Sequence, residues 1–346
     1  MNVEEVTHRV LMQSGLTAVG LGIARAGEPA TTFVAGMRRR KGGTAVTAND
    51  KWHIGSIGKS LTAILVASLL EGDYPTFDCT LPNILPHINM HESWGECTVY
   101  HLLTSSSGLP RDFPLHKILR IHEEDPHKLR QIRRKLIEKA LEKSPRAKSG
   151  TKFEYSNLGY TILGYIAECL AEKPFQDLIY DRVITPLGLS NTGFGAPKGM
   201  AEDDQPMGHR VLFGYRKTVN PFKGVSDLPT VIAPAGRLHM SLGDLLKYGS
   251  VHLAGEKSTN PLLKHETWKL LHTPYVDNYA CGWVCQHEEW AAGRVIWHNG
   301  SNGMWYSHLF LFPERDFVIA IVTNDGAIKV AAEAFPAAAK EIIEAM

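Results

Sequence analysis

Strand-like sequence lies near both ends of this 346-residue chain, and mainly helical sequence separates the two groups. Two early runs, residues 17–26 and 31–39, form an N-terminal pair joined by a short turn. Four late runs have connections short enough to favour antiparallel pairing: residues 279–286, 293–299, 305–313 and 317–324. A final helix, residues 328–345 with Pro336 as a kink, is placed to cover one sheet face. The pattern predicts the α+β class, with an antiparallel sheet flanked by helices and a mainly helical middle.

Composition argues against several classes of function. The net charge of +1 gives no overall attraction to nucleic acid or to an anionic membrane. No apolar stretch reaches the roughly 18 residues of a membrane span, and the acidic start does not resemble a signal peptide. The five cysteines are odd in number and scattered, which fits reduced thiols. We therefore expect a cytoplasmic protein that acts on a small molecule, with no nucleic acid and no membrane span. The sequence makes no prediction of oligomeric state.

The segment around Ser56 and Lys59 predicts a nucleophile beside a base. An apolar helix begins here, and the spacing of three residues places both side chains on one helical face. Burial and the helix N-terminus both disfavour a protonated lysine, so the pKa of Lys59 should fall towards that of a working base. A neutral amine beside Ser56 can take the hydroxyl proton, which makes the oxygen a nucleophile.

This motif is weak by itself, because a second copy occurs at Ser149 and Lys152 in a loop-like stretch. The alternative interpretation of Ser56 is a helix N-cap followed by a solvated lysine. A second element, Tyr155 and Asn157, favours catalysis. A tyrosine oxygen near an amine can relay a proton, and an asparagine amide can hold both the lysine and a substrate carbonyl. The alternative for this element is a turn and N-cap before the next helix.

A third element follows late in the chain at His298, Asn299, Gly300 and Ser301. A glycine near the end of a strand lets a substrate backbone approach closely. The N–H group after it can point at a carbonyl oxygen, as an oxyanion hole requires. The simpler alternative is a strand-end histidine before a turn.

The three elements, in this order, resemble the serine β-lactamase and penicillin-recognising DD-peptidase family, nearest to its class C-like and esterase-like branch. The family pattern is Ser-x-x-Lys, Tyr-x-Asn, then Lys-Thr-Gly or His-x-Gly. Other stretches are similar to the family as well, such as LLTSSSGLP at 102–110 and APAGRLHMSLGDLLKYG at 233–249. The resemblance implies an α/β lobe from residues 1–75 and 230–346, a mainly helical lobe from 76–229, and an active site in the cleft between them.

The resemblance also implies a role for each matching residue. Ser56 is the expected acylated nucleophile, and Lys59 and Tyr155 share proton transfer. Asn157, His298, Asn299 and Gly300 are expected to bind or orient the substrate. The backbone N–H groups of Ser56 and Ser301 are the expected oxyanion hole. Neither a metal nor a cofactor is implied.

His298 and Asn299 depart from the class C pattern, which has lysine and threonine there. A lysine is a permanent charge that attracts a β-lactam carboxylate, whereas histidine is largely neutral at pH 7. We therefore expect a serine hydrolase that forms an acyl-enzyme with a small ester, amide or D-amino-acid peptide and reacts weakly with β-lactams. The alternatives are a true β-lactamase or DD-peptidase and, further away, a non-catalytic binding or assembly protein that keeps the fold.

Other chemistries lack their motifs. The chain has no Gly-x-Ser-x-Gly elbow, no phosphate-binding Gly-rich loop and no His-Glu-x-x-His pair among its sixteen histidines. Residues 111–148 hold twelve Lys or Arg against six Asp or Glu. An apolar stripe of Leu129, Ile132, Leu136 and Ala140 predicts a solvated basic helix rather than a membrane or nucleic-acid arm.

Overall fold

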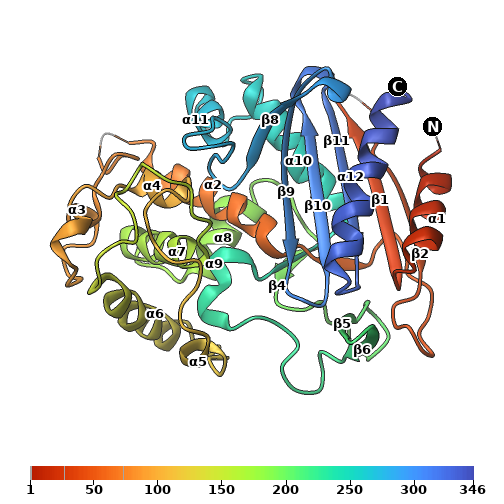
Figure 1. The fold of residues 1–346 in the computed structure, drawn as a ribbon, viewed down its shortest axis with the longest axis horizontal. Helices are drawn as coiled ribbons and strands as arrows, with labels where there is room; N and C mark the ends of the chain where they lie inside the picture. The colour runs from red at the N-terminus through yellow and green to blue at the C-terminus, as the bar shows by residue number, and fades with distance from the viewer. Residues whose placement is uncertain (1, 27, 73) are drawn as a thin grey trace.

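The computed structural model describes residues 2–26, 28–72 and 74–346. A six-stranded antiparallel sheet forms one side of the molecule, with strand order β2-β1-β11-β10-β9-β8 (Figure 1). The strands come from both ends of the chain: β1 Ala18–Arg25, β2 Thr31–Gly36, β8 Val284–Glu288, β9 Gly293–Ser301, β10 Tyr306–Phe312 and β11 Phe317–Thr323. The predicted α+β class is therefore confirmed.

Helices cover both faces of this sheet. On one face α1 (Val3–Ser14) packs beside α12 (Ile328–Glu344), and Arg9 pairs with Glu341 across their contact (Figure 1). α10 (Leu242–Glu256) packs on the other face. Successive residues of β11 point alternately to these two layers, with Ile319 towards α12 and Val318 towards α10. Burial on both faces explains why every residue of β11 is buried.

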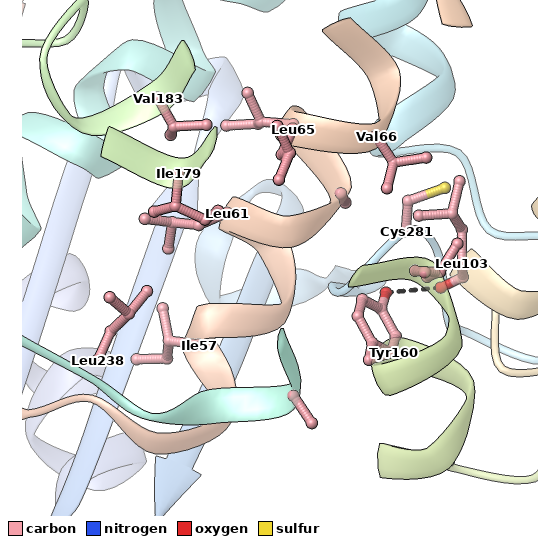
Figure 2. Packing of buried hydrophobic residues seen from close by; sticks show 14 of the residues in the cluster. Ile57, Leu61, Leu65, Val66, Leu103, Tyr160, Ile179, Val183, Leu238 and Cys281 are labelled. Atoms are coloured by element: carbon pink, nitrogen blue, oxygen red, sulfur yellow. Dashed lines mark hydrogen bonds between the residues drawn. The ribbon is translucent and has the colours of Figure 1, made fainter. Parts of the chain in front are cut away.

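The central helix α2 (Gly58–Leu70) is apolar around nearly its whole circumference because it is surrounded by protein. It packs against α7 (Asn157–Ala171). Figure 2 shows two groups around it: Ile57, Leu61 and Leu65 with Ile179, Val183 and Leu238 on one side, and Val66 with Leu103, Tyr160 and Cys281 on the other. The Tyr160 hydroxyl donates to the Leu103 carbonyl at 2.7 Å. This packing holds the N-terminus of α2, which carries Ser56, in one position.

The other helices lie mostly on the side away from the large sheet (Figure 1): α3 Leu81–Ile84, α4 Val99–Leu103, α5 Leu115–Ile118, α6 Pro126–Leu141, α8 Phe175–Ile179, α9 Ala233–Gly236 and α11 His265–Leu271. Two small sheets complete the fold: β3 Lys51–His53, β7 Leu238–Ser241 and β4 Thr192–Phe194 form one, and β5 Gly208–Leu212 with β6 Tyr215–Val219 the other.

The division into two lobes at the stated boundaries stays a prediction. Within 76–229, two parts contact residues outside that range. β4 pairs with β7, and in β5 the His209 N–H donates to the Met304 carbonyl at 3.0 Å.

The basic segment contains α6, whose buried face is rotated from the predicted stripe. Leu129 is buried, but Ile132, Leu136 and Ala140 are only half-buried. The buried face includes Arg133, which pairs with Glu168 and donates to the Val231 carbonyl at 3.1 Å. A buried carboxylate partner is what permits an arginine on this face. None of the helices in the described residues is both long enough and apolar enough to span a lipid bilayer.

Candidate active site

Ser56 lies in the 3-10 turn Gly55–Ile57 that leads directly into α2. Gly55 has a left-handed φ of 51°, and a Cβ on it would lie 2.2 Å from the Ser301 nitrogen. Only glycine fits here, because any side chain would collide with the end of β9. The turn therefore holds Ser56 against the strand that carries the third predicted element.

Lys59 is fully buried one turn after Ser56. Its Nζ lies 2.6 Å from the Asn157 Oδ1, 2.6 Å from the Ala235 carbonyl oxygen and 3.3 Å from the Ser56 Oγ. The first two partners can only accept hydrogen bonds, so they take two N–H groups of the amine. A neutral amine has a lone pair left for its third neighbour, the Ser56 hydroxyl.

The surroundings of Lys59 favour this neutral form. Burial lowers the pKa of Lys59 well below its usual value, and the nearby Arg111 lowers it further, whereas Asp112 opposes the shift. An uncharged amine at neutral pH is the form in which lysine acts as a base.

Tyr155 completes the group around the nucleophile. Lys59 Nζ lies 4.7 Å from the centre of the Tyr155 ring. Burial raises the pKa of Tyr155 to about 12, although a hydrogen bond to Ser56 acts in the opposite direction. The phenol therefore keeps its proton at neutral pH and can act as a donor. Lys59 and Tyr155, which the sequence predicts to share proton transfer, have environments that move their pKa values apart.

Asn157 is the first residue of α7 and links that helix to Lys59. Its Nδ2 donates to the Asp112 Oδ1 at 2.7 Å, so one of its two amide hydrogens is occupied by the protein. Ser156 caps the helix, accepting from the Gly159 N–H at 2.9 Å. The helix-start interpretation of this segment is correct for Ser156, and it coexists with the contact between Asn157 and Lys59.

His298 is buried and neutral. Its Nδ1 faces the Asn299 carbonyl, which can only accept, so this nitrogen carries the ring proton. Its Nε2 is then free to accept from the Tyr279 hydroxyl at 3.2 Å. Burial and the nearby Lys59 lower the pKa of His298 to about 3. This strand therefore presents no cation at His298.

The end of β9 is in direct contact with the turn that carries Ser56. A Cβ on Gly300 would lie 1.9 Å from the Ile54 carbonyl oxygen and 2.6 Å from the Ser56 nitrogen. This approach brings the backbone N–H groups of Ser56 and Ser301 close together. Both residues line one cleft of about 580 Å³, together with Tyr155, His298, Asn299 and Gly300. The predicted site residues thus meet in one place, with Lys59 and Asn157 just beneath them.

Sequence reasoning missed Asp227, which lies behind both sides of this contact. Its Oδ1 lies 3.0 Å from the His53 Nε2, and His53 Nδ1 accepts from the Gly55 N–H at 3.1 Å. The same Oδ1 accepts from Asn302 Nδ2 at 3.0 Å. Although burial raises its pKa, His53, Arg237 and Asn302 together lower the pKa of Asp227 to about 2. One ionised carboxylate therefore connects the Ser56 turn with the residue after Ser301.

Several other residues of the cleft also went unpredicted, and three of them are polar or aromatic residues near Tyr155. Arg111 lies at its mouth, 5.6 Å from the centre of the Tyr155 ring, and Phe153 and Tyr279 line its wall. Arg111 directly follows a stretch that resembles the family, which is the signal that could have found it. The second Ser-x-x-Lys copy lies in a turn where Ser149 donates to the Ser107 carbonyl and Lys152 is exposed. Within the described residues, no three His, Cys, Asp or Glu side chains cluster to hold a metal ion.

A family model described as Beta-lactamase matches residues 4–341. Penicillin-binding protein 4 of Amycolatopsis lactamdurans is 24% identical over 312 residues, which cover 85% of this chain and 77% of that protein. Protein flp of Staphylococcus aureus is 22% identical over 280 residues, 79% of this chain, and the match spans about half of that longer relative (53%).

Solved structures share the fold. An octameric penicillin-binding protein homologue from Pyrococcus abyssi has a TM-score of 0.77 at 24% identity, covering 97% of this chain and 77% of that one. The crystal structure of SurE has a TM-score of 0.76 at 21% identity, and the match covers 97% of this chain and 75% of the SurE chain.

Proposed function

Because this chain belongs to the beta-lactamase family, we propose that it is a serine hydrolase that forms an acyl-enzyme at Ser56. Its proposed substrate is a small ester, amide or D-amino-acid peptide. The observation that carries the proposal is the environment of Lys59. Two acceptors at 2.6 Å take its N–H groups, and the remaining position faces the Ser56 oxygen.

Acylation follows from this arrangement. Lys59 takes the Ser56 proton as the oxygen attacks the substrate carbonyl carbon. The N–H groups of Ser56 and Ser301 stabilise the resulting oxyanion, an interaction that strengthens as the charge develops. Tyr155 gives its proton to the leaving alcohol or amine, and the proton held by Lys59 restores the phenol. The bond from carbonyl carbon to leaving group breaks, and Ser56 carries the acyl group.

Deacylation uses the same groups in reverse order. A water molecule replaces the leaving group near Tyr155. As the water oxygen attacks the ester carbon, Tyr155 takes one water proton and passes its own phenol proton to Lys59. The Ser56 oxygen leaves and recovers a proton from Lys59. Each turnover therefore consumes one water and restores all three side chains.

The charge of the cleft supports a preference for esters, neutral amides and short peptides over β-lactams. Neutral His298 offers no fixed charge to a β-lactam carboxylate, and Asn299 stands where the family has threonine. Arg111 at the mouth favours the second candidate, a true β-lactamase or DD-peptidase, because its guanidinium can pair with a carboxylate. A non-catalytic protein with this fold is the third candidate.

One experiment separates these candidates: intact-protein mass measured over time with a penicillin, a short acyl ester and a fluorophosphonate, together with the substrate remaining. We expect a fluorophosphonate adduct and ester turnover, both lost in Ser56→Ala. The control is Ser68→Ala, which changes another serine of α2 and should behave as wild type.

The outcomes are distinct. A lasting penicillin adduct, or penicillin loss that depends on Ser56, would favour the second candidate. Absence of any adduct or turnover in a folded protein would favour the third. Ester turnover that survives Ser56→Ala would overturn the assignment of the nucleophile.

A further inference from the structure

We propose that the groove between α12 and strands β9 and β10 is an extension of the substrate site, and that it takes an apolar, ring-sized group carrying one hydrogen-bonding atom. The groove has a volume of about 360 Å³. The proposal rests on the proposed function, because the group belongs to the molecule that reacts at Ser56.

The groove exists because the helix above it carries small side chains. Ala332, Pro336 and Ala337 form one wall, with Lys340 beyond them on the same helix. The opposite wall comes from the strands and includes Trp297 and Phe310, with Glu288 at its edge. An aromatic wall facing small side chains suits a flat apolar group.

The groove is continuous with the catalytic cleft. Trp297, Asn299, Tyr306 and Ala332 line both of them. Among the residues that the structure describes, β8 pairs with 293–297 of β9, and the stretch 298–301 has no partner strand on that side. A substrate whose carbonyl lies at Ser301 can therefore extend over this open edge and reach the groove.

A buried and unsatisfied histidine lines the groove. His308 is only 3% exposed, and neither ring nitrogen has a hydrogen-bond partner among the described residues. Its ring stacks on Phe310 with centroids 3.9 Å apart, which fixes its plane. Buried polar groups normally have partners, so an unpartnered imidazole in the lining of a groove indicates a ligand atom.

The protonation state of His308 limits which ligand atom it can bind. Burial lowers the pKa of His308 well below its usual value, so the ring is neutral and offers one donor and one acceptor. A hydroxyl or an amide can pair with either nitrogen, whereas a carboxylate can only accept and an ammonium can only donate. The predicted group is therefore a phenol-like or amide-bearing ring rather than a charged one.

The test compares esters that differ in one group. One series carries an acetyl group on ethanol, 2-phenylethanol or 2-(4-hydroxyphenyl)ethanol, and the other carries ethanol on the corresponding acids. We expect kcat/KM to rise by about tenfold or more for the hydroxylated ring in one of the series. A preference in the alcohol series assigns the groove to the leaving group, and one in the acid series assigns it to the acyl group.

Two variants locate the effect. His308→Phe keeps the stacked ring and removes the hydrogen bonds, so the advantage of the hydroxyl should disappear while ethyl acetate turnover stays unchanged. Ala337→Leu lies outside the Ser56 cleft and narrows the groove, so it should reduce the preference for both rings. If His308 has only a structural role, His308→Phe will leave the selectivity unchanged, and that result overturns the proposal.

Ligand binding to the Ser56→Ala variant distinguishes failure of the groove proposal from failure of the proposed hydrolase function. Titration with 2-(4-hydroxyphenyl)ethanol needs no turnover, and we expect saturable binding that His308→Phe weakens by about tenfold. Binding without any ester hydrolysis would support the groove and contradict the hydrolase. Ethyl acetate turnover without ring preference or binding would support the hydrolase and contradict the groove.

Discussion

At the scale of single residues, most of the chemistry depends on Lys59, because its amine is buried and still reaches Ser56. A lysine at the surface would be charged at neutral pH and could not accept a proton. Here burial removes the charge, and Asn157 and Ala235 orient the amine. Tyr155 shows the opposite effect of the same burial, since its phenol is kept protonated.

The pH dependence of activity should report these residues. Lys59 must be unprotonated, so kcat/KM should rise with pH through the lowered pKa of Lys59 and reach a plateau above it. Tyr155 must be protonated, and its pKa of about 12 puts the alkaline decline beyond the usual assay range. Rates from pH 4 to pH 10 with a neutral ester would test this.

His298→Gln is the matched variant for that profile. His298 already has a pKa of about 3, so it stays neutral across the range and its removal should leave the acid limb in place. An acid limb that vanished in His298→Gln would assign the titration to the histidine and contradict the assignment to Lys59.

At the scale of elements, the site is a contact between the turn before α2 and the end of β9. Each supplies one N–H group of the proposed oxyanion hole, so the distance between the two backbones controls transition-state stabilisation. Glycine at positions 55 and 300 permits the approach, and Asp227 connects the two sides from behind.

Gly300→Ala should separate these two elements. Its Cβ would lie 1.9 Å from the Ile54 carbonyl oxygen, so the strand must shift, and we expect kcat to fall by about 10²-fold or more. Gly243→Ala in α10 is the control, since a Cβ there meets only one atom, at 4.0 Å. That variant should keep full activity and gain up to about 1 kcal/mol of stability. Steady-state kinetics and thermal unfolding measure both, and an active Gly300→Ala would refute the tight contact.

Asp227→Asn should loosen the same contact without removing a catalytic group. The variant keeps the size of the side chain but loses the charge that pairs with His53 and Arg237. We expect kcat to fall by about 10- to 100-fold with KM little changed, because a small displacement of an oxyanion donor affects the transition state most. Asp177→Asn, on the exposed side of α8, is the matched control. Equal kcat in the two variants would show that Asp227 has no positioning role.

At the scale of the whole molecule, the large sheet joins segments that are about 300 residues apart in the chain. β1 pairs with β11, so the N-terminal hairpin enters the sheet only when the C-terminal strands are present. The contact of α1 with α12 joins the two ends again on one face. The Ser56 turn and β9 are brought together by this long-range pairing.

Removing α12 should therefore damage the whole protein. Deletion of residues 328–346 would expose the apolar face of the sheet, including Phe310, Ile319 and Ile321, and we expect insoluble protein or a large fall in Tm. Deletion of 345–346 alone, beyond the end of α12, should leave Tm unchanged. Soluble yield and thermal unfolding measure the difference, and a stable, active protein without α12 would contradict this view of the core.

Most strands of the large sheet and the candidate chemistry could be predicted from the sequence, whereas the helix at 3–14 was missed and the run 279–286 is strand only from residue 284. The features that could be predicted are local patterns: the strand runs at both ends, the apolar helix after Ser56 and the three separated motifs. A local pattern can be recognised without knowing which remote segments pack against it. The i,i+3 spacing already placed Ser56 beside Lys59. The buried face of α6 differs from the predicted apolar stripe because it includes Arg133. The carboxylate that pairs with Arg133 belongs to Glu168 on another helix, so the α6 sequence alone could not show it.

The protonation of the site, the residues that support it and its extent depend on how remote segments pack. The pKa of Lys59 depends on what packs around it, and its acceptor at Ala235 lies 176 residues away. Asp227 and the groove beside His308 carry no sequence signature of their own. Their properties arise from distance and desolvation, which exist only once remote segments have packed together.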